Sequence, residues 1–185
     1  MALYPYCIPK HYTEDVFKIP YEKLKEQGKD TLFFDLDNTI MSYDQTQISK
    51  TYLELLNTLK KEFKVVIVSN SGYKRVSKAC LPHDLLFVHS AKKPLKSGYF
   101  KAMKLANSTV DTCVFIGDQI MTDVFGSNRI GLFSILTRPV KQRTDHIFTR
   151  LNRKIEKRMI KNIKKHIPQQ YNEVLKSYAE DIHHL

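Results

Sequence analysis

Two aspartates, Asp35 and Asp37, stand one residue apart at the end of the apolar run in LFFDLDNT, residues 32–39. The run has the continuous apolar character of a buried strand. A carboxylate at the end of a buried strand is costly in free energy unless it is paired with a cation or bound to a metal ion. The pair therefore indicates a site at the end of this strand.

Two further aspartates, Asp118 and Asp123, come after a second apolar run, DTCVFIG, residues 111–117. Together with Asp35 and Asp37 they offer hard oxygen ligands, which favour Mg²⁺ over zinc or copper. A divalent cation would also offset the mutual repulsion of these carboxylates. The four aspartates therefore predict a magnesium site.

Ser69 and Asn70 end a third apolar run, and Lys93 follows a fourth. A hydroxyl group and an ammonium group both suit the oxygens of a phosphate. A cation, a lysine and a hydroxyl group around a carboxylate are the parts needed for phosphoryl transfer, in which the carboxylate attacks phosphorus. Each residue alone is common in turns and helix caps, so the prediction depends on their occurrence together.

These side chains need elements that bring several strand ends to one place. Continuous apolar runs alternate with stretches of helical periodicity, a pattern that predicts a three-layer α/β/α, Rossmann-like fold with a mainly parallel sheet. In such sheets ligands bind at the carboxyl ends of the strands, where all these polar residues lie. The expected strands are 31–35, 64–70, 85–90, 111–118 and 132–137, and the expected helices are 49–61, 73–80, 96–106 and 119–129.

The polar clusters also resemble, in order and spacing, the four motifs of the haloacid dehalogenase (HAD) superfamily, over residues 30–137. With GSNRIG, the arm YxxPKHYTEDVFKI and the tail TRLNRKIEKRMIK, the chain looks most like the YqeG-type HAD phosphatases. That group includes phosphatidylglycerophosphate phosphatases. The matching motifs are DLDNT (35–39), VSN (68–70), KP (93–94) and GDQIMTD (117–123).

The resemblance implies catalytic roles for the first motif. Asp35 would be the nucleophile that forms an aspartyl-phosphate. Asp37 would protonate the leaving oxygen and then activate water, and its main-chain carbonyl would bind Mg²⁺. Because dehalogenases of the superfamily lack the second aspartate, Asp37 implies a phosphatase.

The other motifs would hold the metal ion and the phosphate. Asp118 would bind the metal ion together with Asp35 and Asp37. Asp123 would either bind it or accept hydrogen bonds from metal-bound water and Lys93. The phosphate-binding residues implied are Ser69, Asn70 and Lys93.

The chain has no room for the cap domain that covers the site in many members of this superfamily. Residues 40–48 are the only free length after the first motif, and a helix and a strand fill the interval between Ser69 and Lys93. The site should therefore be open. Enzymes for small metabolites usually enclose their ligand, so an open site favours a substrate presented by a protein, a nucleic acid end or a membrane.

The charge of the chain is concentrated near its C-terminus. Thirty Lys and Arg residues against nineteen Asp and Glu residues give a net charge of +11, of which residues 138–166 carry +9. Apolar residues recur at every fourth position of this segment and predict a helix from about Asp145 to Ile167. Its stripe would either pack on the core or dock on anionic lipid, and nucleic acid ranks lower. The stripe consists of Ile147, Leu151, Ile155, Met159, Ile163 and Ile167.

These observations predict a single domain, with an N-terminal arm (1–29), a catalytic core (30–140) and a basic helical tail (141–185). No apolar run is long enough to span a bilayer and no signal pattern begins the chain, so we expect a cytoplasmic protein, peripheral on the inner face of the membrane. The expected reaction is Mg²⁺-dependent hydrolysis of phosphatidylglycerophosphate to phosphatidylglycerol. The alternatives are a phosphatase for a phosphoprotein, nucleotide or sugar phosphate, and a nucleic-acid or ribosome-associated binding protein.

Overall fold

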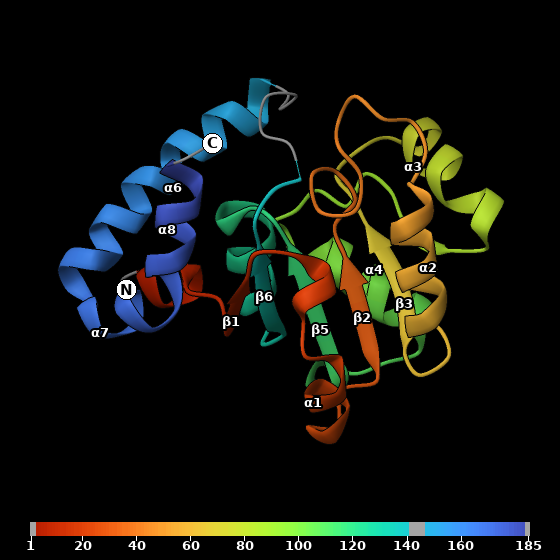
Figure 1. Cartoon of the computed structure of the whole chain (residues 1–185), viewed down its shortest axis with the longest axis horizontal. Helices are drawn as coiled ribbons and strands as arrows, with labels where there is room; N and C mark the ends of the chain where they lie inside the picture. The colour runs from red at the N-terminus through yellow and green to blue at the C-terminus, as the bar shows by residue number, and fades with distance from the viewer. Residues whose placement is uncertain (1–2, 141–146, 184–185) are drawn as a thin grey trace.

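The computed structural model describes residues 3–140 and 147–183, and the side chains of residues 3–140 and 152–181. Six strands form one sheet in the order β1-β6-β5-β2-β3-β4, and every neighbouring pair is parallel (Figure 1). The strands are β1 His11–Thr13, β2 Thr31–Phe34, β3 Lys64–Val68, β4 Leu86–Val88, β5 Cys113–Gly117 and β6 Phe133–Thr137.

Helices connect these strands and also form the end of the chain. The main helices are α1 Tyr21–Glu26, α2 Lys50–Leu59, α3 Tyr73–Cys80, α4 Lys96–Ala106, α5 Phe125–Asn128, α6 Ile147–His166, α7 Pro168–Gln170 and α8 Lys176–His183. A π-helical turn at Ile120–Val124 leads into α5, and a second one at Tyr171–Leu175 leads into α8.

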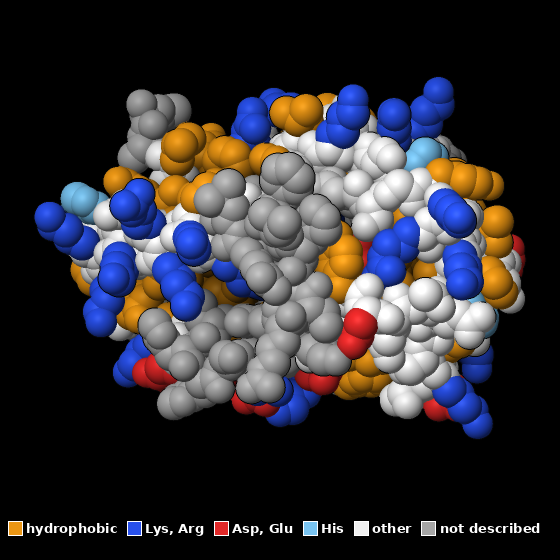
Figure 2. Space-filling view, turned by 90° about the horizontal axis from the view of Figure 1, so that it is seen from above, with side chains coloured by type: hydrophobic (Ala, Val, Ile, Leu, Met, Phe, Trp, Pro, Cys, Tyr) orange, Lys and Arg blue, Asp and Glu red, His pale blue; other side chains and the backbone are white. Residues whose placement is uncertain are grey.

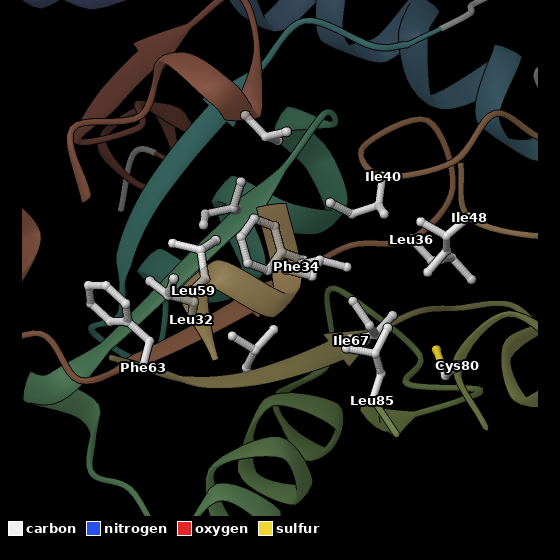
Figure 3. Packing of buried hydrophobic residues seen from close by; sticks show 14 of the residues in the cluster. Leu32, Phe34, Leu36, Ile40, Ile48, Leu59, Phe63, Ile67, Cys80 and Leu85 are labelled. Carbon is white, nitrogen blue, oxygen red and sulfur yellow. The ribbon is translucent and has the colours of Figure 1, made fainter. Parts of the chain in front are cut away.

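Alternate residues of β2 bury their side chains on opposite faces of the sheet, as the two-residue period of a strand requires. Leu32 and Phe34 pack in a cluster with Leu59 and Phe63 on the face covered by α2 and α3 (Figure 3). Phe33 packs on the other face, against residues of α4. The structure thus confirms the α/β/α layers and the parallel sheet expected from the sequence.

The strands and helices expected between residues 31 and 137 are all present, although some ends differ by a few residues. The N-terminal arm contains a strand that the sequence did not indicate, because His11–Thr13 forms the edge strand β1 and pairs with β6. β1 has only three residues, which are exposed, half-buried and buried in turn. A segment of this length is too short to show the two-residue period of a strand. The arm also contains the short helix α1.

Within residues 3–140 and 147–183, no separate domain covers the carboxyl edge of the sheet. Residues 35–49 contain no helix or strand beyond one isolated bridge, and residues 69–93 hold only α3, a short 3-10 turn and β4. Both intervals are fully described, so the prediction that the chain has no cap domain is confirmed at these positions.

The tail folds back as two helices, α6 and α8, that pack beside the β1 edge of the sheet (Figure 1). Ile163 is fully buried in a hydrophobic cluster that joins α6 and α8 to β6 and the π-helical turn at Ile120–Val124. Ile155 is 42% exposed, and Ile160 is buried in the cluster in its place. A four-residue repeat drifts around a helix of 3.6 residues per turn, so it cannot stay on one face. Packing on the core is therefore observed for this half of α6, while the side chains of Ile147 and Leu151 lie outside the described residues.

Across residues 3–140 and 147–183, none of the helices has both the length and the apolar character that crossing a bilayer requires.

The tail packing gives the first testable prediction. Replacing Ile163 with Ala should lower the free energy of unfolding by about 2–4 kcal/mol, because the change leaves a cavity between α6 and the core. Ile155→Ala, on the same helix but half exposed, should cost less than about 1 kcal/mol. Urea denaturation of both variants measures the difference. Equal losses would contradict the orientation of α6.

Candidate active site

The carboxyl ends of the strands bring the predicted site residues together. Asp35 follows β2, Ser69 follows β3 and Asp118 follows β5, while Lys93 lies in the loop after β4. A polar cavity of about 220 Å³ opens at this edge. That is smaller than a typical drug-sized pocket, so it suits a phosphate-sized group. Its lining residues are Asp35, Asp37, Tyr43, Ser69, Asn70, Ser71, Lys93, Gln119, Thr122 and Asn152.

Lys93 lies at the centre of the site. Its Nζ donates hydrogen bonds to Asp35 Oδ1 at 2.6 Å and to Asp123 Oδ1 at 2.7 Å. All three side chains are buried, and the ammonium group also lies over the ring of Phe115. Burial lowers the pKa of Lys93, but the charges of Asp123 and Asp35 raise it by more than burial lowers it. The pKa of Lys93 therefore lies above its ordinary value. Lys93 is therefore a fixed positive charge beside Asp35.

Three buried carboxylates form the candidate metal centre. Single oxygens of Asp35, Asp118 and Asp123 lie within 4.8 Å of one another. Burial raises the pKa of Asp35 well above its usual range, and the charges of the nearby aspartates raise it further against the opposing effect of Lys93. A cluster of buried oxygen donors with this electrostatic cost fits a hard divalent cation such as Mg²⁺.

Asp123 lies directly against Gly117 and makes two hydrogen bonds there. Its Oδ2 accepts the main-chain N–H of Gln119 at 3.0 Å while Oδ1 accepts from Lys93. A Cβ atom at Gly117 would lie 2.4 Å from the Asp123 carboxyl group. The glycine at the end of β5 therefore allows this carboxylate to lie against the strand.

Asp37 lies apart from the three clustered carboxylates. Its carboxylate accepts hydrogen bonds from Arg75 Nε and Ser71 Oγ, both at 2.7 Å, and from Ser69 Oγ at 3.3 Å. Arg75 also stacks on the ring of Tyr43, with its guanidinium 5.0 Å from the ring centroid. Sequence reasoning missed Arg75. The available signal was its position in α3, the helix that begins directly after the polar end of β3.

Asn70 lines the cavity and also hydrogen-bonds to the backbone of Lys93. Its Oδ1 accepts the main-chain N–H of Lys93 at 2.7 Å, and its Nδ2 donates to the Lys93 carbonyl at 3.0 Å. The two bonds connect the loop after β3 to the loop after β4. Asn70 therefore fixes the backbone from which Lys93 reaches Asp35.

The tail also contributes residues to this edge of the sheet, which sequence reasoning did not anticipate. Arg153 forms an ion pair with the Asp118 carboxylate, and the buried Glu156 accepts the main-chain N–H of Ile120. Burial raises the pKa of Glu156 from its ordinary 4.5 to about 7, against the opposing effect of Arg153. The basic segment 138–166 thus contains two charged residues whose side chains are largely shielded from solvent.

The raised pKa of Glu156 predicts a pH-dependent stability. A carboxyl group whose pKa is higher in the folded chain binds more protons when folded, so its contribution to stability falls as pH rises from 4.5 to about 7. The free energy of unfolding should fall by about 3 kcal/mol relative to that of Glu156→Gln across this window, and stay level above it. Glutamine is the matched variant because its carbonyl oxygen can still accept the Ile120 N–H.

Urea denaturation of both proteins at a series of pH values measures this difference. A wild-type free energy of unfolding that rises with pH relative to that of Glu156→Gln would contradict the prediction, because it would mean that the ionised carboxylate is the stabilised form.

Comparisons with known proteins bear on the identity of this site. The family model described as mitochondrial PGP phosphatase matches residues 3–141. "Probable phosphatase YqeG" of Bacillus subtilis is 34% identical over 161 residues, which cover 86% of this chain and 93% of that protein. "Phosphatidylglycerophosphate phosphatase 1, chloroplastic/mitochondrial" of Arabidopsis thaliana is 23% identical, over 84% of this chain and 48% of that protein.

Among solved structures, the deoxy-D-mannose-octulosonate 8-phosphate phosphatase of Haemophilus influenzae aligns with a TM-score of 0.48 at 14% identity, over 80% of this chain and 98% of that chain. The family match spans the sheet and every predicted site residue. It confirms the resemblance drawn from the motifs: the chain belongs to the PGP phosphatase family and is a phosphatase of the HAD superfamily, of the YqeG type.

Proposed function

We propose that this phosphatase hydrolyses a phosphate monoester through a covalent phosphate on Asp35. The observation that carries the proposal is the position of Lys93, whose ammonium group lies 2.6 Å from Asp35 at the floor of a phosphate-sized polar cavity. An ammonium group there can hold a phosphate oxygen beside the attacking carboxylate. Ser69 and Asn70, at the same cavity, are the proposed further contacts to the phosphate.

The proposed reaction has two balanced steps. An Asp35 oxygen attacks phosphorus and forms an O–P bond, the bond from phosphorus to the leaving oxygen breaks, and Asp37 gives its proton to that oxygen. A water molecule then attacks the same phosphorus, the Asp35–phosphorus bond breaks and Asp37 takes the proton of the water. The contacts from Arg75 and Ser71 hold the Asp37 carboxylate at the mouth of the cavity during both steps.

The proposed cofactor is Mg²⁺, held by Asp35 and Asp118, by the main-chain carbonyl of Asp37 and by Asp123 either directly or through water. When bound, it would neutralise the buried carboxylates and the charge on the phosphate oxygens. The raised pKa of Asp35 disfavours the ionised carboxylate that must attack phosphorus. A cation bound beside it would favour the ionised form.

The proposed substrate is phosphatidylglycerophosphate, converted to phosphatidylglycerol at the surface of an anionic membrane. The description of the matching family and the name of the Arabidopsis relative support this substrate. The absence of an inserted domain in residues 35–49 and 69–93 supports it independently, because a lipid phosphate presented by a membrane can reach a site that these intervals leave uncapped. On this proposal the protein works on the cytoplasmic face of the membrane.

The outer face of α6 supports contact with such a membrane. Figure 2 looks down on the edge where the strands end, and Lys and Arg side chains are spread over the tail at its left. Each basic residue near an anionic surface contributes about 1 kcal/mol, so several together give reversible binding. From residue 152 onward, where the side chains of α6 are described, the exposed basic residues are Lys154, Lys157, Arg158, Lys161, Lys164 and Lys165.

Phosphate release from phosphatidylglycerophosphate in mixed micelles tests this proposal, with Mg²⁺ and with EDTA. We expect release that EDTA abolishes and that Asp35→Asn lowers by at least about 1,000-fold, because the amide cannot act as the nucleophile. Asp84→Asn, an equivalent change at an exposed position directly after the 3-10 turn Leu81–His83, should leave the rate unchanged.

A panel of soluble phosphate esters and phosphopeptides is run beside the lipid. Faster turnover of one of these would retain the chemistry and overturn the lipid substrate. Normal turnover by Asp35→Asn would overturn the covalent mechanism, and RNA binding without any turnover would favour the nucleic-acid alternative.

A further inference from the structure

The tail makes buried polar contacts with the loop that carries Asp118. Arg153 donates from Nη1 to the main-chain carbonyl of Asp118 at 3.2 Å, and its Nη2 pairs with Oδ2 of the same residue. The Arg153 side chain is only 11% exposed. One guanidinium group on α6 thus holds both the backbone and the carboxylate of Asp118.

Glu156 and Tyr178 extend these contacts along the loop. Glu156 Oε1 accepts the main-chain N–H of Ile120, and Glu156 Oε2 lies 3.5 Å from Arg153 Nη1. The Tyr178 hydroxyl group, on α8, lies 3.4 Å from both the Asp118 carbonyl and Glu156 Oε1. Two helices of the tail therefore contact the short segment 118–120.

Burial gives these contacts their strength. Both side chains of the Arg153–Glu156 pair are nearly inaccessible, so their polar groups have lost water and depend on partners within the protein. Asp118 is fully buried, and its Oδ1 lies 3.4 Å from Thr39 Oγ1 while its Oδ2 pairs with Arg153. A carboxylate with a partner at each oxygen has little freedom to rotate.

We propose that Arg153 and Glu156 are positioning residues for the cation site: they fix Asp118 and the turn after it in the arrangement that binds the metal ion. The inference goes beyond the proposed function, on which it rests only for the presence of the cation. It makes the tail a part of the active site as well as a basic surface.

An opposite role for Arg153 makes an opposite prediction. If the guanidinium group only neutralised Asp118 and competed with a bound cation, its removal would tighten cation binding. If it positions Asp118, its removal loosens binding, and changes in residues that orient metal ligands typically cost about 10–100-fold in metal affinity. The direction of the change therefore separates the two roles.

The test measures Mn²⁺ binding to the full chain without substrate, from the electron paramagnetic resonance signal of free Mn²⁺. Mn²⁺ is the probe because it shares the preference of Mg²⁺ for oxygen ligands. We expect Arg153→Met to weaken the Mn²⁺ affinity by about tenfold or more, because Asp118 then loses both contacts. Arg158→Met, at an exposed arginine five residues further along α6, is the matched control and should stay within about twofold.

Two further variants protect the test against simple unfolding. Arg153→Lys keeps the charge but cannot reach both Asp118 oxygens in the same way, and Tyr178→Phe removes one hydroxyl group while keeping the ring in the core. Both should fold, as the melting temperature checks, and both should weaken Mn²⁺ binding. Saturating Mg²⁺ should restore most of the turnover of Arg153→Lys on a phosphate ester.

Unchanged or tighter Mn²⁺ binding in these folded variants would overturn the proposal, and so would lost turnover that saturating cation does not restore. Asp118→Asn is measured in parallel. If it binds Mn²⁺ as well as the wild-type protein does, the proposed metal site itself is wrong, and the positioning role falls with it. The identity of the phosphate ester does not enter the binding measurement, so a failure of the lipid substrate would be recognised separately.

Discussion

The ion pairs of buried Lys93 are the constraint on which the rest of the site depends. An ammonium group that is 2% exposed is stable only if carboxylates surround it, and Asp35 and Asp123 do so at hydrogen-bond distance. These residues come from three separate parts of the chain. The order of the strands, the bonds from Asn70 to the Lys93 backbone and the glycine at the end of β5 all serve to bring them within reach.

The parallel sheet explains why these charges can be buried without a covering domain. Parallel strands end at the same edge, and the loops after β2, β3 and β5 start from strands that pair with a neighbour on each side. The α2, α3 and α4 helices cover the faces and leave this edge to polar residues. In the part of the chain that the structure describes, no inserted domain covers this edge, an arrangement that suits chemistry on a substrate held by a larger surface.

Local patterns were sufficient to predict the central strands and the residues at their ends. Asp35, Ser69 and Asp118 follow apolar runs, so each could be recognised within a few residues of sequence. β1 and Arg75 could not be, because β1 is too short to show a period and Arg75 reaches Asp37 across 38 positions. The positions of Arg153 and Glu156 depend on how a distant helix docks, which a periodicity does not specify.

The tail shows why a count of charges is a poor guide to a surface. Residues 138–166 have a net charge of +9, but the guanidinium group of Arg153 and the carboxylate of Glu156 face the core rather than solvent. Because α6 has a buried side and an exposed side, one helix can hold the Asp118 loop and present lysines outward. Holding the Asp118 loop and presenting positive charge to solvent use different residues of α6. Mutations can therefore remove a buried contact without changing the exposed lysines, or the reverse.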